Sequence, residues 1–165
     1  MRIYEGSPRQ QWEEVLRSIG AFADRERLKE LLLLELDTGF LLQGLALPVA
    51  SAWTESEGML TKATHELPDD DIGKLMDEAV AKRSEEAPTT PHTEIANFYE
   101  QALRVIGAYL DAQPARDIFF FEQGGSFVLR VLIAPAPGAT TGHQLVEFTK
   151  EDILSMIEAA PQQRD

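Results

Sequence analysis

Two stretches of the chain show the same succession of apolar and polar positions. In residues 12–48, apolar side chains first recur at intervals of three or four positions and then gather in two short runs, and residues 99–135 follow the same order. The first spacing is typical of an amphipathic helix, and short apolar runs between turn residues are typical of strands. Each stretch is therefore predicted to form a helix followed by a β-hairpin.

The two stretches also agree residue by residue. Aligned without a gap, they share twelve identical residues, from Glu13 with Glu100 to Pro48 with Pro135. Unrelated segments of this length would agree at roughly two or three positions by composition, so the agreement predicts an internal duplication.

A third strand and a second helix are expected in each copy. Residues 59–67 and 143–148 are more polar strands, typical of a sheet edge, and the apolar positions after them recur at helical spacing. Residues 84–93 are polar and contain proline, as a connector does. We therefore predict an α+β fold of two αβββα units, residues 1–83 and 94–165, with antiparallel sheets, helices packed on one face and halves related by a pseudo-twofold axis.

Gly20 and Gly107 occupy equivalent positions inside the first helix of each copy. Glycine inside a helix costs about 1 kcal/mol relative to alanine, so a compensating close contact is expected at both positions. We predict a helix crossing or a tight approach of helix to sheet. The alternative is a tolerated glycine that both copies inherited.

The first two strands of each copy are apolar on both faces, because residues 31–34 are all leucine and neighbouring side chains of a strand point to opposite sides. One face would pack on the helices, whereas the other needs a cover, since large apolar patches rarely stay exposed. We expect this second face to form a contact between copies, between subunits or with a partner; ordinary core packing is the alternative. The residues that alternation places on it are Leu41, Gln43, Leu45, Val128, Arg130 and Leu132.

Composition narrows the classes of partner. The chain has 15 Lys and Arg against 28 Asp and Glu, a formal net charge of −13, which repels nucleic-acid phosphates and anionic lipid. The acidic surface is expected to serve solubility, with affinity for basic or aggregation-prone polypeptides as the alternative. The absence of cysteine excludes disulfides, thiolate metal sites and cysteine nucleophiles. No signal peptide or membrane helix is recognisable, so a cytoplasmic location is expected.

The segment Asp37-Thr38-Gly39 matches the tripeptide of aspartic proteases. That mechanism needs two carboxylates that share a proton, and the second copy has Gly124 in place of Asp37, so a homodimer would have to supply the second one. A hairpin turn is the favoured interpretation, because Asp, Thr and Gly suit the backbone angles of a tight turn.

Other candidate sites are equally weak. His65, His92 and His143 lack the spacing of metal ligands, and the acidic run 69–71 stands at a predicted helix start, where it complements the helix dipole. We expect no catalytic residue, no metal site and no cofactor. Three polar pairs are shared by the copies, and structural pairing is favoured for them because duplicated enzymes usually need copies that differ at the active centre. These pairs are Arg17 with Arg104, Asp24 with Asp111 and Glu35 with Glu122.

In element order and acidity, the chain resembles the YbjN-like proteins and the type III secretion chaperones, small α+β proteins that dimerise and hold polypeptide partners. The resemblance is one of pattern over most of the chain, with no motif that carries functional residues across. It implies a non-enzymatic protein–protein interaction or chaperone-like module, whose partner is a polypeptide or a second copy of the chain in a homodimer. The alternative is a small-ligand-binding or hydrolytic domain, which would have a concave pocket with convergent polar groups.

Overall fold

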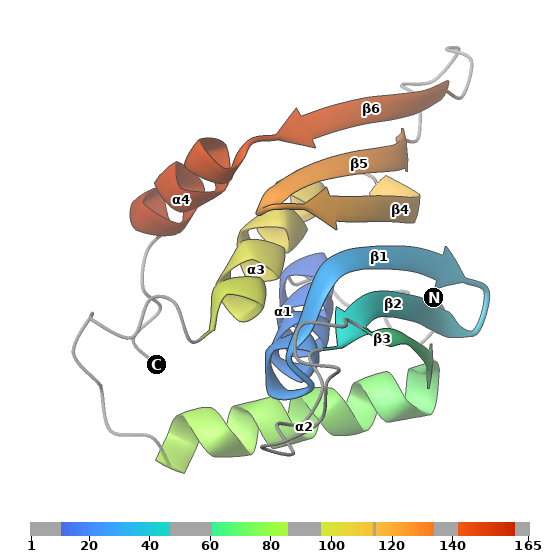
Figure 1. Ribbon diagram of the computed structural model, residues 1–165, viewed down its shortest axis with the longest axis vertical. Coiled ribbons are helices and arrows are strands. Elements are labelled where there is room, and N and C mark those ends of the chain that lie inside the picture. Colours follow the sequence, from blue (N-terminus) through green and yellow to red (C-terminus); the bar gives the residue numbers. More distant parts are fainter. Residues whose placement is uncertain (1–10, 47–60, 86–96, 114, 134–141, 161–165) are drawn as a thin grey trace, which may run out of the picture.

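A computed structural model describes residues 11–46, 61–85, 97–113, 115–133 and 142–160. This part of the chain is an α+β fold with four helices and one open, antiparallel, six-stranded sheet (Figure 1). The helices are α1 (Gln11–Arg25), α2 (Asp69–Glu85), α3 (Phe98–Asp111) and α4 (Lys150–Ala159). The strands are β1 (Leu28–Leu36), β2 (Gly39–Ala46), β3 (Thr61–Pro68), β4 (Ala115–Gln123), β5 (Ser126–Ile133) and β6 (Gly142–Phe148).

The predicted elements are all found, with small shifts at their ends. α2 continues to Glu85, so the first two residues of the predicted connector are helical, and residues 86–93 lie outside the described part of the chain. Both hairpin turns lie where glycine predicted them. β2 begins at Gly39, and Gly124 and Gly125 have φ angles of 59° and 90°, in the left-handed region that glycine adopts without a steric penalty.

The two hairpins join into one sheet through their first strands. The strand order is β3-β2-β1-β4-β5-β6, and β1 pairs with β4 antiparallel, with Leu32 opposite Phe121 and Leu34 opposite Phe119. The sheet therefore has the more polar strands β3 and β6 at its two edges and the apolar strands in its middle, as Figure 1 shows. Polar residues on an edge strand discourage pairing with another sheet.

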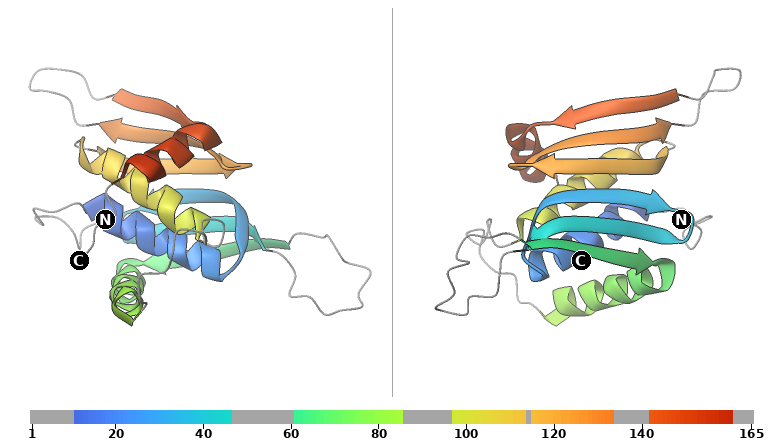
Figure 2. Two further views of the ribbon diagram at one scale, coloured as in Figure 1. Left: turned by 90° about the vertical axis from the view of Figure 1, so that its left-hand side faces the viewer. Right: turned by 45° about the vertical axis from the view of Figure 1, so that its right-hand side comes forward.

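The helices lie on one side of the sheet (Figure 2). α1 and α3 lie side by side beneath the centre, α2 lies beside α1 near the β3 edge, and α4 lies beside α3 near β6. The core between the layers is formed by strand residues that alternate along each strand and are fully buried against the helices. In the four central strands these residues include Leu31, Leu33, Phe40, Leu42, Ile118, Phe120, Phe127 and Leu129.

α1 and α3 approach each other closely at two glycines. A Cβ atom added to Gly20 would lie 2.9 Å from the Cα atom of Glu100 and closer still to the carbonyl of Tyr99. A Cβ atom added to Gly107 would lie 2.6 Å from the Cα atom of Glu13. Only a residue without a side chain allows the two backbones this separation, which accounts for glycine in the interior of both helices.

Each of these helices also caps the other. The carboxylate of Asp24 accepts hydrogen bonds from the backbone amides of Tyr99 (3.2 Å) and Glu100 (2.9 Å) at the start of α3. The carboxylate of Asp111 accepts the corresponding bonds from Trp12 (2.8 Å) and from Glu13 (2.9 Å) at the start of α1. The first amides of a helix have no partner within the helix, so each carboxylate satisfies donors that would otherwise be orphaned.

Two β-bulges are held in a similar way. Glu30 in β1 and Asp117 in β4 both have a φ angle of 52°, and the register shifts at these points of the two strands. The carboxylate of Glu122 accepts the amide of Leu31 at 3.0 Å, and that of Glu35 accepts the amide of Ile118 at 3.0 Å. A bulge leaves an amide without its ladder partner, and a carboxylate of the neighbouring strand replaces that partner in each case.

Candidate functional site

The side of the sheet opposite the helices has no described element over it (Figure 2). We call this side the open face. Its central residues form two rows that follow the strand pairing across β2, β1, β4 and β5. The first row is Leu41, Leu34, Phe119 and Arg130, and the second row is Gln43, Leu32, Phe121 and Val128.

All six residues that strand alternation grouped together lie on the open face. Leu41, Gln43 and Leu45 are half-buried and alternate with buried residues of β2. On β5, the half-buried Val128 and Leu132 and the exposed Arg130 alternate with buried residues in the same way. The two predicted copies, however, meet through the β1–β4 pairing and the α1–α3 crossing. The open face therefore points away from the contact between them.

The open face is apolar at its centre. Phe121 leaves 41% of its surface exposed and Leu145, on β6, leaves 75%, although both are large hydrophobic residues. The rings of Phe119 and Phe121 pack beside each other, with centroids 6.5 Å apart. A contiguous apolar surface of this kind is uncommon on a free monomer and marks interaction sites.

Charges on the open face lie mostly along its two edges. In the two central rows Arg130 is the one charged residue, and its guanidinium lies 5.5 Å from the ring centroid of Phe119. The edge strand β3 places Glu66 opposite Leu41 and Lys62 opposite Leu45. The other edge strand, β6, places Glu147 opposite Val128. An apolar centre with a polar rim is the usual anatomy of a protein–protein interface.

The matched polar residues hold the two helices together. Arg17 pairs with Glu100 at 3.1 Å, and Arg104 pairs with Glu13 at 3.8 Å, the latter pair being almost fully buried. Burial raises the pKa of Glu13 against the opposing effect of the Arg104 charge. Burial also lowers the pKa of Arg104, and the nearby charge of Arg17 adds to this. Each of these groups has a partner within the fold, so the arrangement is structural.

The remaining sequence candidates are dispersed. Asp37 is exposed in the turn between β1 and β2, and His143 is exposed on β6. His65 packs its ring edge-on against Phe22, with centroids 5.0 Å apart. His92 lies outside the described residues. The acidic run opens α2, where the amide of Asp69 donates to the carbonyl of Thr38 at 2.9 Å.

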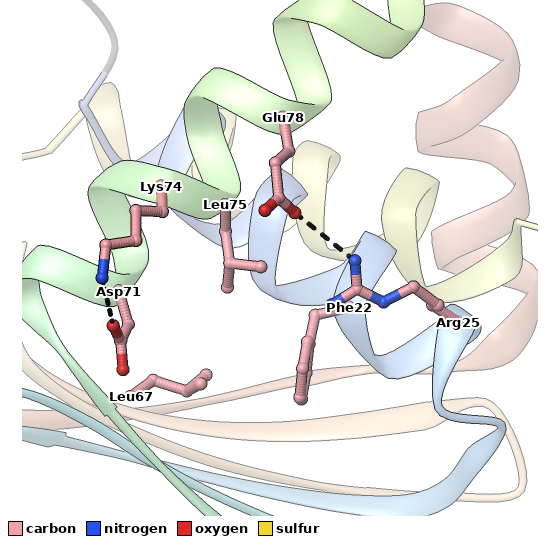
Figure 3. A pocket seen from close by; sticks show the side chains of 7 residues that line it. All are labelled: Phe22, Arg25, Leu67, Asp71, Lys74, Leu75 and Glu78. Atoms are coloured by element: carbon pink, nitrogen blue, oxygen red, sulfur yellow. Dashed lines mark hydrogen bonds and ion pairs between the residues drawn. The ribbon is translucent and has the colours of Figure 1, made fainter.

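A small hollow lies between α2, the end of α1 and β3 (Figure 3). Its volume is about 250 Å³, and the charged groups at its rim are already paired, Arg25 with Glu78 at 3.4 Å and Lys74 with Asp71 at 3.3 Å. Leu67, Leu75 and Phe22 supply its apolar lining. The hollow has no pair of titratable groups poised on a common point, as acid–base chemistry would need.

Among the residues that the structure describes, no group of three or more histidine, aspartate or glutamate side chains is placed to hold a metal ion. No helix in the described ranges is long and apolar enough to cross a bilayer. No family model, curated protein or solved structure matches the chain.

Sequence reasoning missed half of the open face. It identified the outward residues of β2 and β5 but not Leu32, Leu34, Phe119 and Phe121, which form the middle of the surface. The runs of consecutive leucine and phenylalanine did indicate apolar residues on this side, because neighbouring side chains of a strand point to opposite faces of the sheet. The bulges at Glu30 and Asp117 shift the alternation, so the outward positions of β1 and β4 could not be assigned from spacing alone.

Proposed function

We propose that the protein is a non-enzymatic interaction module, chaperone-like in that it covers apolar polypeptide surface with the open face of its sheet. The observation that carries the proposal is the apolar middle of that face, including Phe121 at 41% exposure, on a sheet whose other side is packed against helices. A cytoplasmic location and the pattern-level resemblance to small polypeptide-binding chaperones belong to the same proposal.

The rigidity of the platform supports this function. The sheet is held by a core of fully buried side chains, and the carboxylates of Glu122 and Glu35 bind the amides at both bulges. A preorganised surface loses little conformational entropy on binding. Because the other side of the sheet is already packed against the helices, a partner can bind the open face without any rearrangement of the fold.

The proposed architecture is a tandem duplication of one αβββα unit with halves related by a pseudo-twofold axis. Its support is the reciprocity of the contacts. Asp24 caps α3 as Asp111 caps α1, and the close approach at Gly20 has its counterpart at Gly107. In every such pair the two residues stand 87 positions apart, the offset at which the two stretches align.

Site-specific photo-crosslinking in living cells tests the proposed function. A photoreactive phenylalanine analogue is placed at Leu41 or at Val128 on the open face, and the matched control carries it at Leu154 of α4, which is 44% exposed on the helical side. We expect polypeptide adducts at the two sheet positions and none above background at the control. The proposal would be contradicted if the two sheet positions gave no adducts, or no more adducts than Leu154.

A further inference from the structure

We propose that the open face is covered by a second copy of this chain, so that two six-stranded sheets stack face to face in a symmetric dimer. This inference rests on the proposed function and names its partner. Three properties of the open face select a second copy: its area, its shape and its distribution of charge.

The area is large enough for a specific dimer that dissociates on dilution. Six strands about 4.8 Å apart, each with about seven paired residues at 3.3 Å, give a face of roughly 24 by 23 Å. Two such faces bury about 1,100 Å² together, which is just above the roughly 1,000 Å² that a specific interface needs and at the low end of the range for dimers. Sheets that pack in this aligned manner keep their strands within about 30° of each other.

The shape of the face is complementary to itself. The strand order is centred on the junction between β1 and β4, so a twofold axis parallel to the strands places β1 of one copy over β4 of the other. Leu34 then faces the partner's Phe119, and Leu32 faces the partner's Phe121. Aliphatic side chains are thus set against aromatic ones throughout the centre, an alternation of smaller and larger groups that allows close packing.

The charges are complementary under the same axis. Leu41 comes to face the partner's Arg130, and Glu66 stands next to Leu41 on the neighbouring strand, so a guanidinium and a carboxylate meet. The β3 edge also lies over the partner's β6 edge, where Thr64 faces the partner's Glu147 and Lys62 and Glu66 each stand one row away from it. The charges of Arg130, Lys62, Glu66 and Glu147 sum to zero, whereas the whole chain has a net charge of −13. Two acidic chains therefore repel each other less when they approach through this face.

Analytical ultracentrifugation of the purified full-length chain tests the dimer. We expect a species of twice the chain mass that dissociates on dilution, and Phe121→Asp should raise the dissociation constant by more than about tenfold because it places two carboxylates in the apolar centre. Leu154→Asp on the helical side is the matched control and should leave the constant unchanged. A wild-type chain that stays monomeric at all concentrations, or a dimer that only the control disrupts, overturns the inference.

A charge exchange tests the predicted orientation. Arg130→Glu should weaken the dimer, and the addition of Glu66→Arg to the same chain should restore most of the lost affinity. A double variant that is weaker than the single one overturns the proposed axis. A monomeric chain that nevertheless yields photo-adducts with another polypeptide at Leu41 refutes the second copy as the occupant and leaves the proposed function standing, so the two failures are distinguishable.

Discussion

Asp24, near the end of α1, accepts a hydrogen bond from the backbone amide of Tyr99 at the start of α3, 75 positions further along the chain. Asp111 does the same for the start of α1. The two helices that support the sheet therefore depend on each other for their first turns, and the open face depends on both of them.

Removal of either cap should destabilise the fold. Asp24→Ala and Asp111→Ala each leave two backbone amides without an acceptor, so each should lower the free energy of unfolding by about 0.5–2 kcal/mol. Asp24→Asn should lose less, because its side-chain oxygen still accepts one bond. Urea unfolding followed by circular dichroism measures the change, and an asparagine variant as unstable as the alanine variant would contradict this account.

The stability contributed by Asp24 should depend on pH. Burial raises the pKa of Asp24 from its ordinary value of 3.8 to about 6, against the lowering effect of the amides of Glu100 and Tyr99. Because the folded state then holds this proton more tightly than the unfolded chain, the part of the stability that comes from protonating Asp24 is fully present below pH 3.8 and is lost as the pH rises towards about 6. Asp24→Asn removes the titrating group, so the stability of the wild type relative to this variant should fall between pH 4 and pH 6. A rise over the same interval would show that the amide bonds dominate instead.

The helix crossing should tolerate no side chain. Gly20→Ala and Gly107→Ala each gain about 1 kcal/mol of helix propensity but force the two backbones apart, which should produce a net loss of at least about 1 kcal/mol in unfolding free energy. Gly73→Ala in α2 is the matched control. A Cβ atom there meets nothing within 4 Å, so that variant should be as stable as the wild type or more stable. Thermal unfolding of the three variants gives the comparison, and a stabilised Gly20→Ala would refute the close-packing explanation.

The local elements could be predicted from sequence because short-range physics determines them. The helical spacing of Leu16, Ile19 and Gly20 predicts α1. The glycines at the second hairpin predict a tight turn, because they adopt positive φ angles. The pairing of β1 with β4 could not be predicted, because antiparallel strands far apart in sequence are joined by contacts that no local pattern encodes. The sequence showed that Asp24 and Asp111 match, but it did not show that each one caps the other copy's helix.

The candidate site was predictable in part for the same reason. Alternation alone located Leu41 and Val128 on one face, since β2 and β5 are regular. Phe121 was missed because a positive φ angle at Asp117 shifts the alternation of β4, and the aspartate there gives no signal of it. A bulge is a tertiary feature, held here by the Glu35 carboxylate of the neighbouring strand.

Both the proposed function and the proposed dimer require that the open face be covered in the cell. Because the chain has no cysteine, single cysteines introduced by Phe121→Cys, Leu145→Cys and Leu154→Cys can each be labelled with a maleimide in intact cells, and the replaced residues are 41%, 75% and 44% exposed in the single chain. We predict that the two sheet positions are labelled several-fold more slowly than the α4 position, and that denaturation makes the three rates equal. Labelling of the sheet positions as fast as that of Leu154→Cys before denaturation would contradict the account.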